Sequence, residues 1–260
     1  MSTNFFSKSV VTMDVSSLHT NTPHNDGINS LNSILNKADY DLNLINYIKR
    51  ATECILKNNN FIFDDKHYLQ LTGTAMGTRM SPKYANIFMA DFETQLMSAT
   101  SHTPLKYFRF IDDIFMIWTA GLENLEKFIE TANNRHPSIK FTHECSASHI
   151  SFLDTTVHLI NNNIETEIFT KPTDSHLYLL PSSCHPRHVT NNLPYSLALR
   201  IKRICSTDIF FQKHIEQLKL QLIKRNYKIT DIDRSIQRIN DIPREDLLTG
   251  PSNRNNNNNL

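Results

Sequence analysis

The stretch Phe108-Arg-Phe-Ile-Asp-Asp-Ile-Phe-Met-Ile-Trp118 places two adjacent carboxylates, Asp112 and Asp113, between two apolar segments. Segments 105–111 and 114–118 are rich in β-branched and aromatic residues, which predicts two strands joined by a tight turn. Neighbouring carboxylates are costly there unless a cation or hydrogen-bond donors compensate them, and Mg²⁺ prefers carboxylate oxygens. On this stretch alone, an ordinary Asp-Asp turn at a hairpin tip is an equally open alternative.

A third carboxylate, Asp14, lies near the end of another apolar segment, residues 9–15, which also has the pattern of a strand. The ends of two strands can lie side by side in an antiparallel sheet, so we expect Asp14 close to Asp112. Three carboxylates on neighbouring strand tips can hold two metal ions about 3.5–4 Å apart, the arrangement used for in-line phosphoryl transfer. The sequence therefore predicts a catalytic site for phosphoryl transfer on Asp14, Asp112 and Asp113, and a metal-dependent nuclease built on the same carboxylates is one alternative.

A second signal is the stretch Gly73-Thr-Ala-Met-Gly-Thr-Arg-Met-Ser-Pro82, which precedes a predicted helix. The chain has only five glycines, and two of them lie here, four residues apart. Glycine lets a backbone approach a ligand closely, and a helix start favours anionic ligands. Ser81 is expected to be the N-cap, with Pro82 in the first turn. A plain loop-to-helix junction is the alternative.

The order of predicted elements is a strand, two helices, a hairpin, a helix, two strands, a helix, a strand and a hairpin. This order predicts an α+β fold, in which helices cover one face of a largely antiparallel sheet. The last hairpin is expected to pair residues 150–160 with 164–170. No strand is expected beyond Pro172, where helices are predicted at 194–205, 207–226 and 231–240.

These patterns predict three parts of the chain. Residues 1–172 form the α+β domain, residues 173–245 form a helical region, and the asparagine-rich tail 246–260 is disordered. Residues 187–244 contain twelve Lys and Arg against five Asp and Glu, a net charge of +7, while residues 1–186 carry −5. An acidic N-terminal part and a basic C-terminal part are typical of a metal-binding core followed by a region that binds a polyanion. An uneven distribution of charge over a solvated surface is the open alternative.

The four cysteines are far apart and form no C-x-x-C pair, which favours a reducing, intracellular location. Neither a signal peptide nor an apolar run long enough for a membrane span is present. Cys184, His185 and His188 could join Cys145 or Cys205 around zinc, but their spacing fits no strong zinc pattern.

Three segments, in order and at sensible spacing, resemble motifs A, B and C of reverse transcriptases. They are Thr12-Met-Asp-Val-Ser-Ser-Leu18, Gly73 to Asn86 and Arg109-Phe-Ile-Asp-Asp-Ile-Phe115. These motifs are most similar to those of Penelope-like retroelements, which also have a Phe-Leu-Asp hairpin, the primer-grip motif E, that resembles Phe152-Leu-Asp154. Such elements also have a block similar to residues 171–206.

This resemblance implies the palm of a right-hand polymerase that synthesises DNA on RNA, followed by a helical thumb and a helix-turn-helix-like region. It implies two Mg²⁺ ions, with Mn²⁺ as a substitute, held by Asp14, Val15, Asp112 and Asp113. The implied partners are an RNA template, a DNA primer and deoxynucleoside triphosphates, with no membrane and no indicated protein partner. It also implies a nuclear location, although no targeting signal is visible.

The resemblance further implies nucleotide contacts from His19, Gly77, Ser81, Phe110 and Lys140. For Lys140, which sits where motif D often has a lysine able to protonate pyrophosphate, a solvated strand lysine is an equal alternative. Contacts with the nucleic acid are expected from basic residues of the helical region: Arg200, Arg203, Lys213, Lys224 and Arg225. Charged helix surfaces are common, so a solvated face is the alternative for this last group.

The sequence also departs from the family pattern. Motif A usually has Tyr or Phe where this chain has His19, and the usual ring blocks a 2′-hydroxyl. Motif C usually begins with Tyr, and Phe110 keeps only the ring. The chain begins thirteen residues before Asp14, so the fingers motifs that hold the triphosphate are expected to be absent from it, as is the GIY-YIG endonuclease of related elements. We therefore expect a fragment that polymerises little by itself, with an inactive remnant that binds nucleic acid as the alternative.

Overall fold

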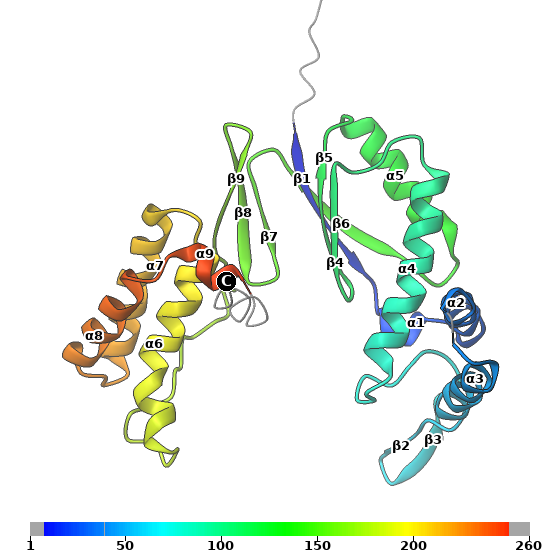
Figure 1. Cartoon of the computed structure of the whole chain (residues 1–260), viewed down its shortest axis with the longest axis horizontal. Coiled ribbons are helices and arrows are strands. Elements are labelled where there is room, and N and C mark those ends of the chain that lie inside the picture. The colour runs from blue at the N-terminus through cyan, green and yellow to red at the C-terminus, as the bar shows by residue number, and fades with distance from the viewer. Residues whose placement is uncertain (1–7, 39, 250–260) are drawn as a thin grey trace, which may run out of the picture. The chain divides into compact units, whose positions relative to one another are not determined.

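The computed structural model describes residues 8–38 and 40–249. The chain divides into two compact units, Met1–Ala147 and Ser148–Leu260 (Figure 1). No helix in the described ranges is both long and apolar enough to span a membrane.

The first unit combines a four-stranded sheet, a separate hairpin and five helices within the described residues. The strands are β1 (Ser9–Val15), β2 (Asn60–Phe63), β3 (Lys66–Leu69), β4 (Lys106–Phe110), β5 (Asp113–Trp118) and β6 (Phe141–Ser146). The helices are α1 (Leu18–Asn21), α2 (His24–Lys37), α3 (Leu42–Lys57), α4 (Ser81–Ala99) and α5 (Leu122–Arg135).

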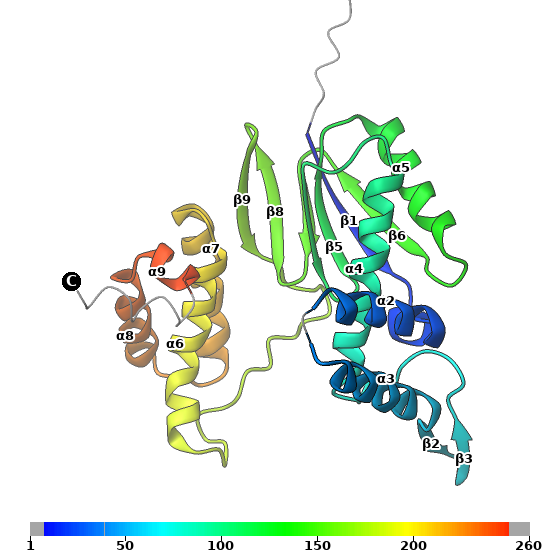
Figure 2. The same cartoon turned by 45° about the vertical axis from the view of Figure 1, so that its right-hand side comes forward.

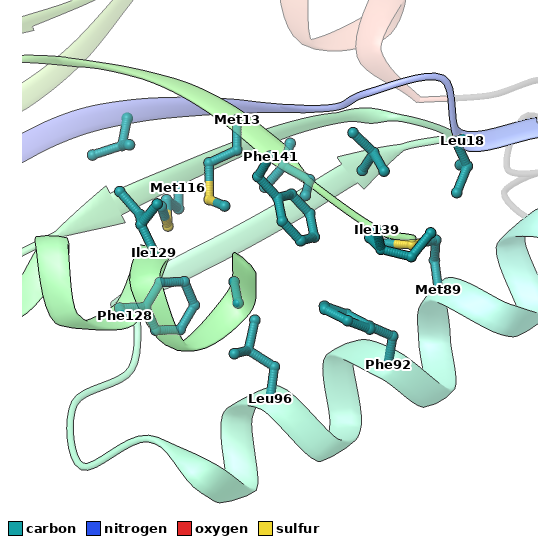
Figure 3. Close-up of a cluster of buried hydrophobic side chains, with 14 of the residues drawn as sticks. Met13, Leu18, Met89, Phe92, Leu96, Met116, Phe128, Ile129, Ile139 and Phe141 are labelled. Atoms are coloured by element: carbon teal, nitrogen blue, oxygen red, sulfur yellow. The ribbon is translucent and has the colours of Figure 1, made fainter. Parts of the chain in front are cut away.

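The sheet has the strand order β4-β5-β1-β6, and every neighbouring pair is antiparallel. Helices α4 and α5 cover one face of it (Figures 1 and 2). Alternate side chains of each strand point to that face, and they form the core with the apolar sides of both helices. Figure 3 shows Met13 and Met116 of the sheet facing Phe128 of α5 and Leu96 of α4. The predicted α+β architecture is confirmed.

Helix α2 packs closely on α4, and a glycine makes this possible. A Cβ atom at Gly27 would collide with the ring of Tyr84, whose hydroxyl donates to the His24 carbonyl at 2.8 Å. The Ser30 hydroxyl donates to Asp91 at 2.9 Å. Helix α2 is therefore fixed against α4, the helix that follows the glycine-rich loop.

The hairpin β2–β3 exposes every residue of both strands. Phe61 and Tyr68 stack across it with ring centroids 5.4 Å apart. It lies between α3 and the glycine-rich loop, where the order of predicted elements includes a hairpin.

The second unit contains a three-stranded antiparallel sheet, in the order β7-β8-β9, and a group of helices. Its strands are β7 (His149–Phe152), β8 (Thr155–Ile160) and β9 (Asn163–Ile168). Its helices are α6 (Arg187–Ile204), α7 (Asp208–Lys224), α8 (Ile229–Asn240) and α9 (Arg244–Leu248). The helices share a core to which Ile201, Phe211, Leu222 and Ile232 contribute.

The predicted strand 150–160 is wrong as a single strand, because the chain turns sharply between β7 and β8. Leu153 has a left-handed backbone, with a φ of 53°, in the segment that resembles motif E. The compact units also divide at residues 147/148 instead of 172. The reason is that β9 joins the helices: the Thr166 hydroxyl donates to the Ile204 carbonyl at 2.6 Å, and the Ser206 amide donates to the Thr166 carbonyl at 2.9 Å.

Two helix predictions also need correction. Helix α6 begins at Arg187 and continues through the buried Pro194, where a helix start had been expected. The tail predicted to be disordered from residue 246 includes part of α9, while residues 250–260 lie outside the described residues.

Glu167 of β9 is a buried carboxylate that three basic side chains surround. Its side chain accepts hydrogen bonds from His158 at 2.9 Å, Lys213 at 2.7 Å and His214 at 2.8 Å. Burial alone would raise its pKa, but these bonds and the Lys213 charge lower the pKa of Glu167 from 4.5 to about 2. The carboxylate therefore links the sheet of the second unit to α7.

Replacing Glu167 with glutamine is expected to cost about 2 kcal/mol of unfolding free energy at neutral pH, because charge-assisted hydrogen bonds of a buried group are lost. A lowered folded-state pKa stabilises the fold above the unfolded pKa, and this stabilisation disappears as the pH falls from 4.5 toward 2. Urea unfolding followed by helical circular dichroism should show a weaker pH dependence in that window for the variant. Glu165→Gln, on the same strand, is the control, and equal effects of both substitutions would contradict the prediction.

Candidate active site

The sheet register brings the predicted carboxylates together. Asp14 of β1 lies directly opposite Asp113 of β5, and Asp113 in turn lies opposite Phe110 of β4. On the other side, Asp14 pairs with Thr142 of β6. Met13, Ile114 and Phe141 point into the helix-covered core, so strand alternation places these four residues in one row on the opposite face.

Asp112 lies in the two-residue turn between β4 and β5, next to this row. Its carbonyl accepts a hydrogen bond of 3.1 Å from the Val15 amide, which ties the turn to the end of β1. The residue before it, Ile111, has a left-handed φ of 57°. A β-branched residue rarely adopts this conformation, and such strain typically costs about 1–3 kcal/mol and collects at functional sites. The turn therefore presents Asp112 at the end of the strand that carries Asp14.

The electrostatics of this cluster are unfavourable in the protein alone. Partial burial, and then the negative charge of Asp112, raise the pKa of the Asp14 carboxyl. Like charges directly opposite each other on neighbouring strands, as at Asp14 and Asp113, also destabilise a sheet. A bound cation would reverse both effects, because it favours the ionised carboxylates.

The donor set suits a hard divalent cation, since carboxylate and carbonyl oxygens are what Mg²⁺ prefers. The Val15 side chain is buried in the core, so only its backbone carbonyl could contribute. Within residues 8–38 and 40–249, however, no group of three or more His, Cys, Asp or Glu side chains is arranged to hold a metal ion. This applies equally to the three aspartates and to the block of Cys184, His185 and His188.

Arg109 supports the turn, a role that the sequence did not reveal. Its guanidinium donates to the Ile111 carbonyl at 3.0 Å. The same group forms an ion pair with Glu93 of α4 and donates to Asn86 Oδ1, also on α4, at 2.6 Å. The Arg109 and Glu93 side chains are only 10% and 17% exposed. Arg109 therefore connects the strained turn to the helix that follows the glycine-rich loop.

Replacing Arg109 with alanine is expected to destabilise the first unit by roughly 2 kcal/mol, because Glu93 and the Ile111 carbonyl lose a partly buried charged donor. Trp118, the single tryptophan of the chain, lies in the core of this unit, so its fluorescence during urea unfolding reports the effect. Arg109→Lys should lose less of the unfolding free energy, because lysine keeps the charge. It should still lose some, because lysine lacks the forked geometry of the guanidinium. The exposed Arg50 provides the control, Arg50→Ala, and an unchanged midpoint for Arg109→Ala would contradict the prediction.

The glycine-rich loop contacts His19 directly. The Thr74 amide donates to the His19 carbonyl at 2.6 Å, and the Thr74 hydroxyl lies 3.3 Å from His19 Nδ1. Gly73 has a left-handed φ of 71°, and a Cβ atom there would collide with the backbone of Thr20. The loop therefore fixes the position of His19, which lies in the first turn after β1.

Gly77 and Ser81, the other two residues of this region predicted to contact a nucleotide, have different surroundings. Gly77 is exposed, and a Cβ atom there would meet no protein atom within 4 Å, so it is open to a ligand. The Ser81 side chain is completely buried, and its hydroxyl donates to the Ala75 carbonyl and lies 2.7 Å from the Thr78 hydroxyl. Ser81 is the first residue of α4 and not its N-cap, which is Met80, and its hydroxyl stabilises the glycine-rich loop.

Lys140 and Phe110 also have different surroundings. Lys140 Nζ donates to the Asn133 carbonyl at 2.6 Å, so the lysine satisfies a carbonyl at the end of α5. This bond gives Lys140 a structural role that requires no bound nucleotide. The Phe110 ring is 58% exposed, in the same cross-strand row as Asp113 and Asp14.

Three of the five basic residues predicted to bind nucleic acid make contacts within the second unit. Arg200 pairs with Asp154 at 2.8 Å, Lys213 with Glu167 at 2.7 Å, and the Arg225 Nε donates to the Tyr178 carbonyl at 2.7 Å. Arg203 and Lys224 are exposed, and neither forms an ion pair within the described ranges. Of the five predicted positions, Arg200 and Lys213 are therefore engaged in ion pairs among the described residues, and Arg225 is held by a backbone carbonyl.

The antiparallel sheet with helices on one face is similar to the fold of nucleic-acid polymerases. Solved structures share it at low sequence identity. The chain superposes on the telomerase of Candida albicans, solved in complex with a fragment of telomeric RNA, with a TM-score of 0.62 and 10% identity over 88% of this chain and 40% of that one.

The RNA-dependent RNA polymerase of a human picobirnavirus gives a TM-score of 0.60 at 11% identity, covering 90% of this chain and 44% of that one. The Sicinivirus RNA-dependent RNA polymerase gives 0.54 at 13%, covering 89% and 52%. The chain thus spans between two fifths and about half of the length of these structures. A family model described as the animal helix-turn-helix domain matches residues 177–237. The curated protein sequences gave no match.

Proposed function

We propose that this chain is the palm and the start of the thumb of a reverse transcriptase of the Penelope-like class, which adds deoxynucleotides to a DNA primer on an RNA template. The observation that carries the proposal is the pairing of Asp14 with Asp113, with Asp112 in the adjoining turn. Like charges that face each other destabilise the sheet unless a cation binds, and carboxylates near one strand end are the donors that a two-metal site requires.

Asp14, Asp112 and Asp113, with the Val15 carbonyl, would hold two Mg²⁺ ions, or Mn²⁺ as a substitute. When bound, these ions supply activation of the attacking 3′-hydroxyl and stabilisation of the leaving pyrophosphate. The protein itself contributes the positions of its groups: Arg109 holds the turn, and Thr74 holds His19. The exposed Phe110 ring offers an apolar surface beside the carboxylates.

Two lines of support narrow the class of polymerase. The ordered motifs A, B, C and E are most similar to Penelope-like elements, and the match of an animal helix-turn-helix model to residues 177–237 fits the region that follows such polymerases. The similar solved structures include a telomerase and RNA-dependent RNA polymerases, which supports an RNA template. A nuclear location follows from the same class and can be tested by imaging a tagged chain.

A primer-extension assay tests the proposal. An RNA template with a DNA primer, deoxynucleotides and Mg²⁺ is incubated with the chain alone, and with the chain fused behind a fingers segment from a related element. We expect little extension by the chain alone and Mg²⁺-dependent extension by the fusion. Degradation of the template without synthesis would favour a nuclease, and ribonucleotide incorporation alone would favour an RNA polymerase.

An inactive remnant that binds nucleic acid is the second candidate. The absence of a ready three-ligand metal group among the described residues favours it. Mn²⁺ binding to the chain, measured by electron paramagnetic resonance, distinguishes the two without any synthesis. Binding that Asp14→Asn weakens supports a metal site, and a chain that binds RNA but no Mn²⁺ is a remnant.

A further inference from the structure

The second unit contains a basic cavity, and none of the five residues predicted to contact nucleic acid lines it. It has a volume of about 420 Å³ and lies between α6, α8 and the turn that precedes α8. Its polar lining includes Asn191, Asn226, Lys228, Asp231, Arg234 and Arg238. We refer to it as the α6–α8 pocket. A cavity of this size is within the range that holds a nucleotide-sized ligand.

Three cations line the α6–α8 pocket. Lys228 is the N-cap residue of α8, and Arg234 and Arg238 lie about one turn apart on the helix. Arg234 and Arg238 are four residues apart, and like charges at that spacing repel. The pocket therefore concentrates positive charge in a concave surface, an arrangement that the free protein does not favour.

Little negative charge compensates these cations. Asp231 is the one acidic residue of the lining, and its contact with Arg234 is long, at 3.4 Å, and exposed on both sides. An exposed ion pair of this kind is weak. Neither Lys228 nor Arg238 has an ion-pair partner within residues 8–38 and 40–249. These uncompensated cations therefore favour the binding of an external anion in the α6–α8 pocket.

Arg238 is also preorganised. Its guanidinium carbon lies 4.5 Å from the centre of the Tyr195 ring, on α6. Stacking on an aromatic ring leaves the guanidinium donors free and in a fixed plane, which suits the two oxygens of a phosphate group. The ring and the guanidinium together provide a flat surface of the kind on which bases stack in single strands.

The walls of the pocket are held in place by hydrogen bonds within the second unit. The Tyr227 hydroxyl donates to the Leu179 carbonyl at 2.9 Å. Asn226 provides the left-handed turn before α8, with a φ of 63°, a conformation that asparagine tolerates well. These contacts fix the linker before α6 against the α7–α8 turn, so the pocket is a defined feature of the unit.

We propose that the α6–α8 pocket binds the phosphodiester backbone of a single nucleic-acid strand. Apart from Pro181, the lining residues belong to the stretch 187–244, which carries a net charge of +7. This charge favours a polyanion over an isolated anion. Its residues belong to the second unit alone, so this binding requires neither the carboxylates of the first unit nor a divalent metal. The inference therefore goes beyond the proposed polymerase activity.

Binding of a fluorescein-labelled single-stranded RNA, followed by anisotropy in EDTA over a range of KCl concentrations, tests the inference on the full chain. The variant Arg234→Gln with Arg238→Gln should bind on the order of tenfold more weakly at low salt. Its plot of log affinity against log salt should be shallower by about 1.4, since each lost phosphate contact of a single strand removes about 0.7. Lys228→Gln, a milder change at the edge of α8, should reduce the slope by about half of that amount.

The matched control removes two cations from α3 of the first unit, as Lys49→Gln with Arg50→Gln. An equal loss of affinity in this control would overturn the inference, because it would show only a general charge effect. Inorganic phosphate should compete only weakly, and competition by phosphate as effective as by unlabelled RNA would also overturn it. An RNA–DNA duplex that binds more tightly than the single strand would replace the proposed ligand with a duplex. Unchanged binding by Asp112→Asn would separate this inference from the proposed catalytic function.

Discussion

Replacing Asp112 with asparagine is expected to lower primer extension by roughly 10³-fold or more while leaving the fold intact. Metal ligands at such a site support several kcal/mol of transition-state stabilisation, and each 1.4 kcal/mol corresponds to about a factor of ten. The substitution keeps the size of the side chain and the backbone contact from Val15 to the Asp112 carbonyl. Single-turnover extension by the fingers fusion measures the loss.

The same substitution should slightly stabilise the first unit. The negative charge of Asp112 raises the pKa of Asp14, so its removal relieves a repulsion present in the metal-free protein. Trp118 fluorescence during urea unfolding should therefore show an equal or higher midpoint for the variant. Asp65→Asn, at the exposed tip of the β2–β3 hairpin, is the matched control with normal extension. Wild-type extension by Asp112→Asn would refute the assignment, and a lower midpoint would show that the loss came from unfolding.

Replacing His19 with tyrosine is expected to raise the preference for deoxynucleotides over ribonucleotides by roughly a hundredfold, a typical size for steric selectivity in a pocket. Imidazole is smaller than phenol and can hydrogen-bond a 2′-hydroxyl instead of excluding it. The contact between His19 Nδ1 and the Thr74 hydroxyl, at 3.3 Å, holds the ring from the side of the glycine-rich loop.

The measurement is kcat/KM for incorporation of each nucleotide type by the fingers fusion and its His19→Tyr variant. Thr74→Val is the companion change: it removes the hydroxyl contact with little change in volume, so it should loosen selectivity without abolishing extension. Equal selectivity of the wild type and His19→Tyr would show that His19 does not face the sugar of the incoming nucleotide.

The strands and helices with clear periodicity were predictable from the sequence. The strand Ser9–Val15 has the bounds that the structure shows, because the segment is rich in β-prone apolar residues and Asp14 lies near its end. The β4–β5 turn was predictable because two carboxylates interrupt two apolar runs. The α+β class followed from the order of these elements.

Other features depend on contacts that no local pattern shows. The turn at Leu153 lacks the Gly or Asn that usually signals a left-handed backbone, so it resembled the middle of a strand. Pro194 predicted a helix start, but α6 accommodates it in its interior. The support from Arg109 joins residues 16 and 23 positions apart, a pairing that appears only when α4 lies on the sheet.

The position of β1 in the sheet has a consequence for how the first unit folds during synthesis. β1 is paired with β5 on one side and β6 on the other, so its register is completed only when residues 141–146 have left the ribosome. Contacts between segments so distant in sequence form slowly, because a long loop must close first. Until then the apolar side of β1 remains open to wrong partners and is an expected binding site for chaperones. The mostly helical second unit, whose contacts are more local, should fold quickly once its last helix emerges.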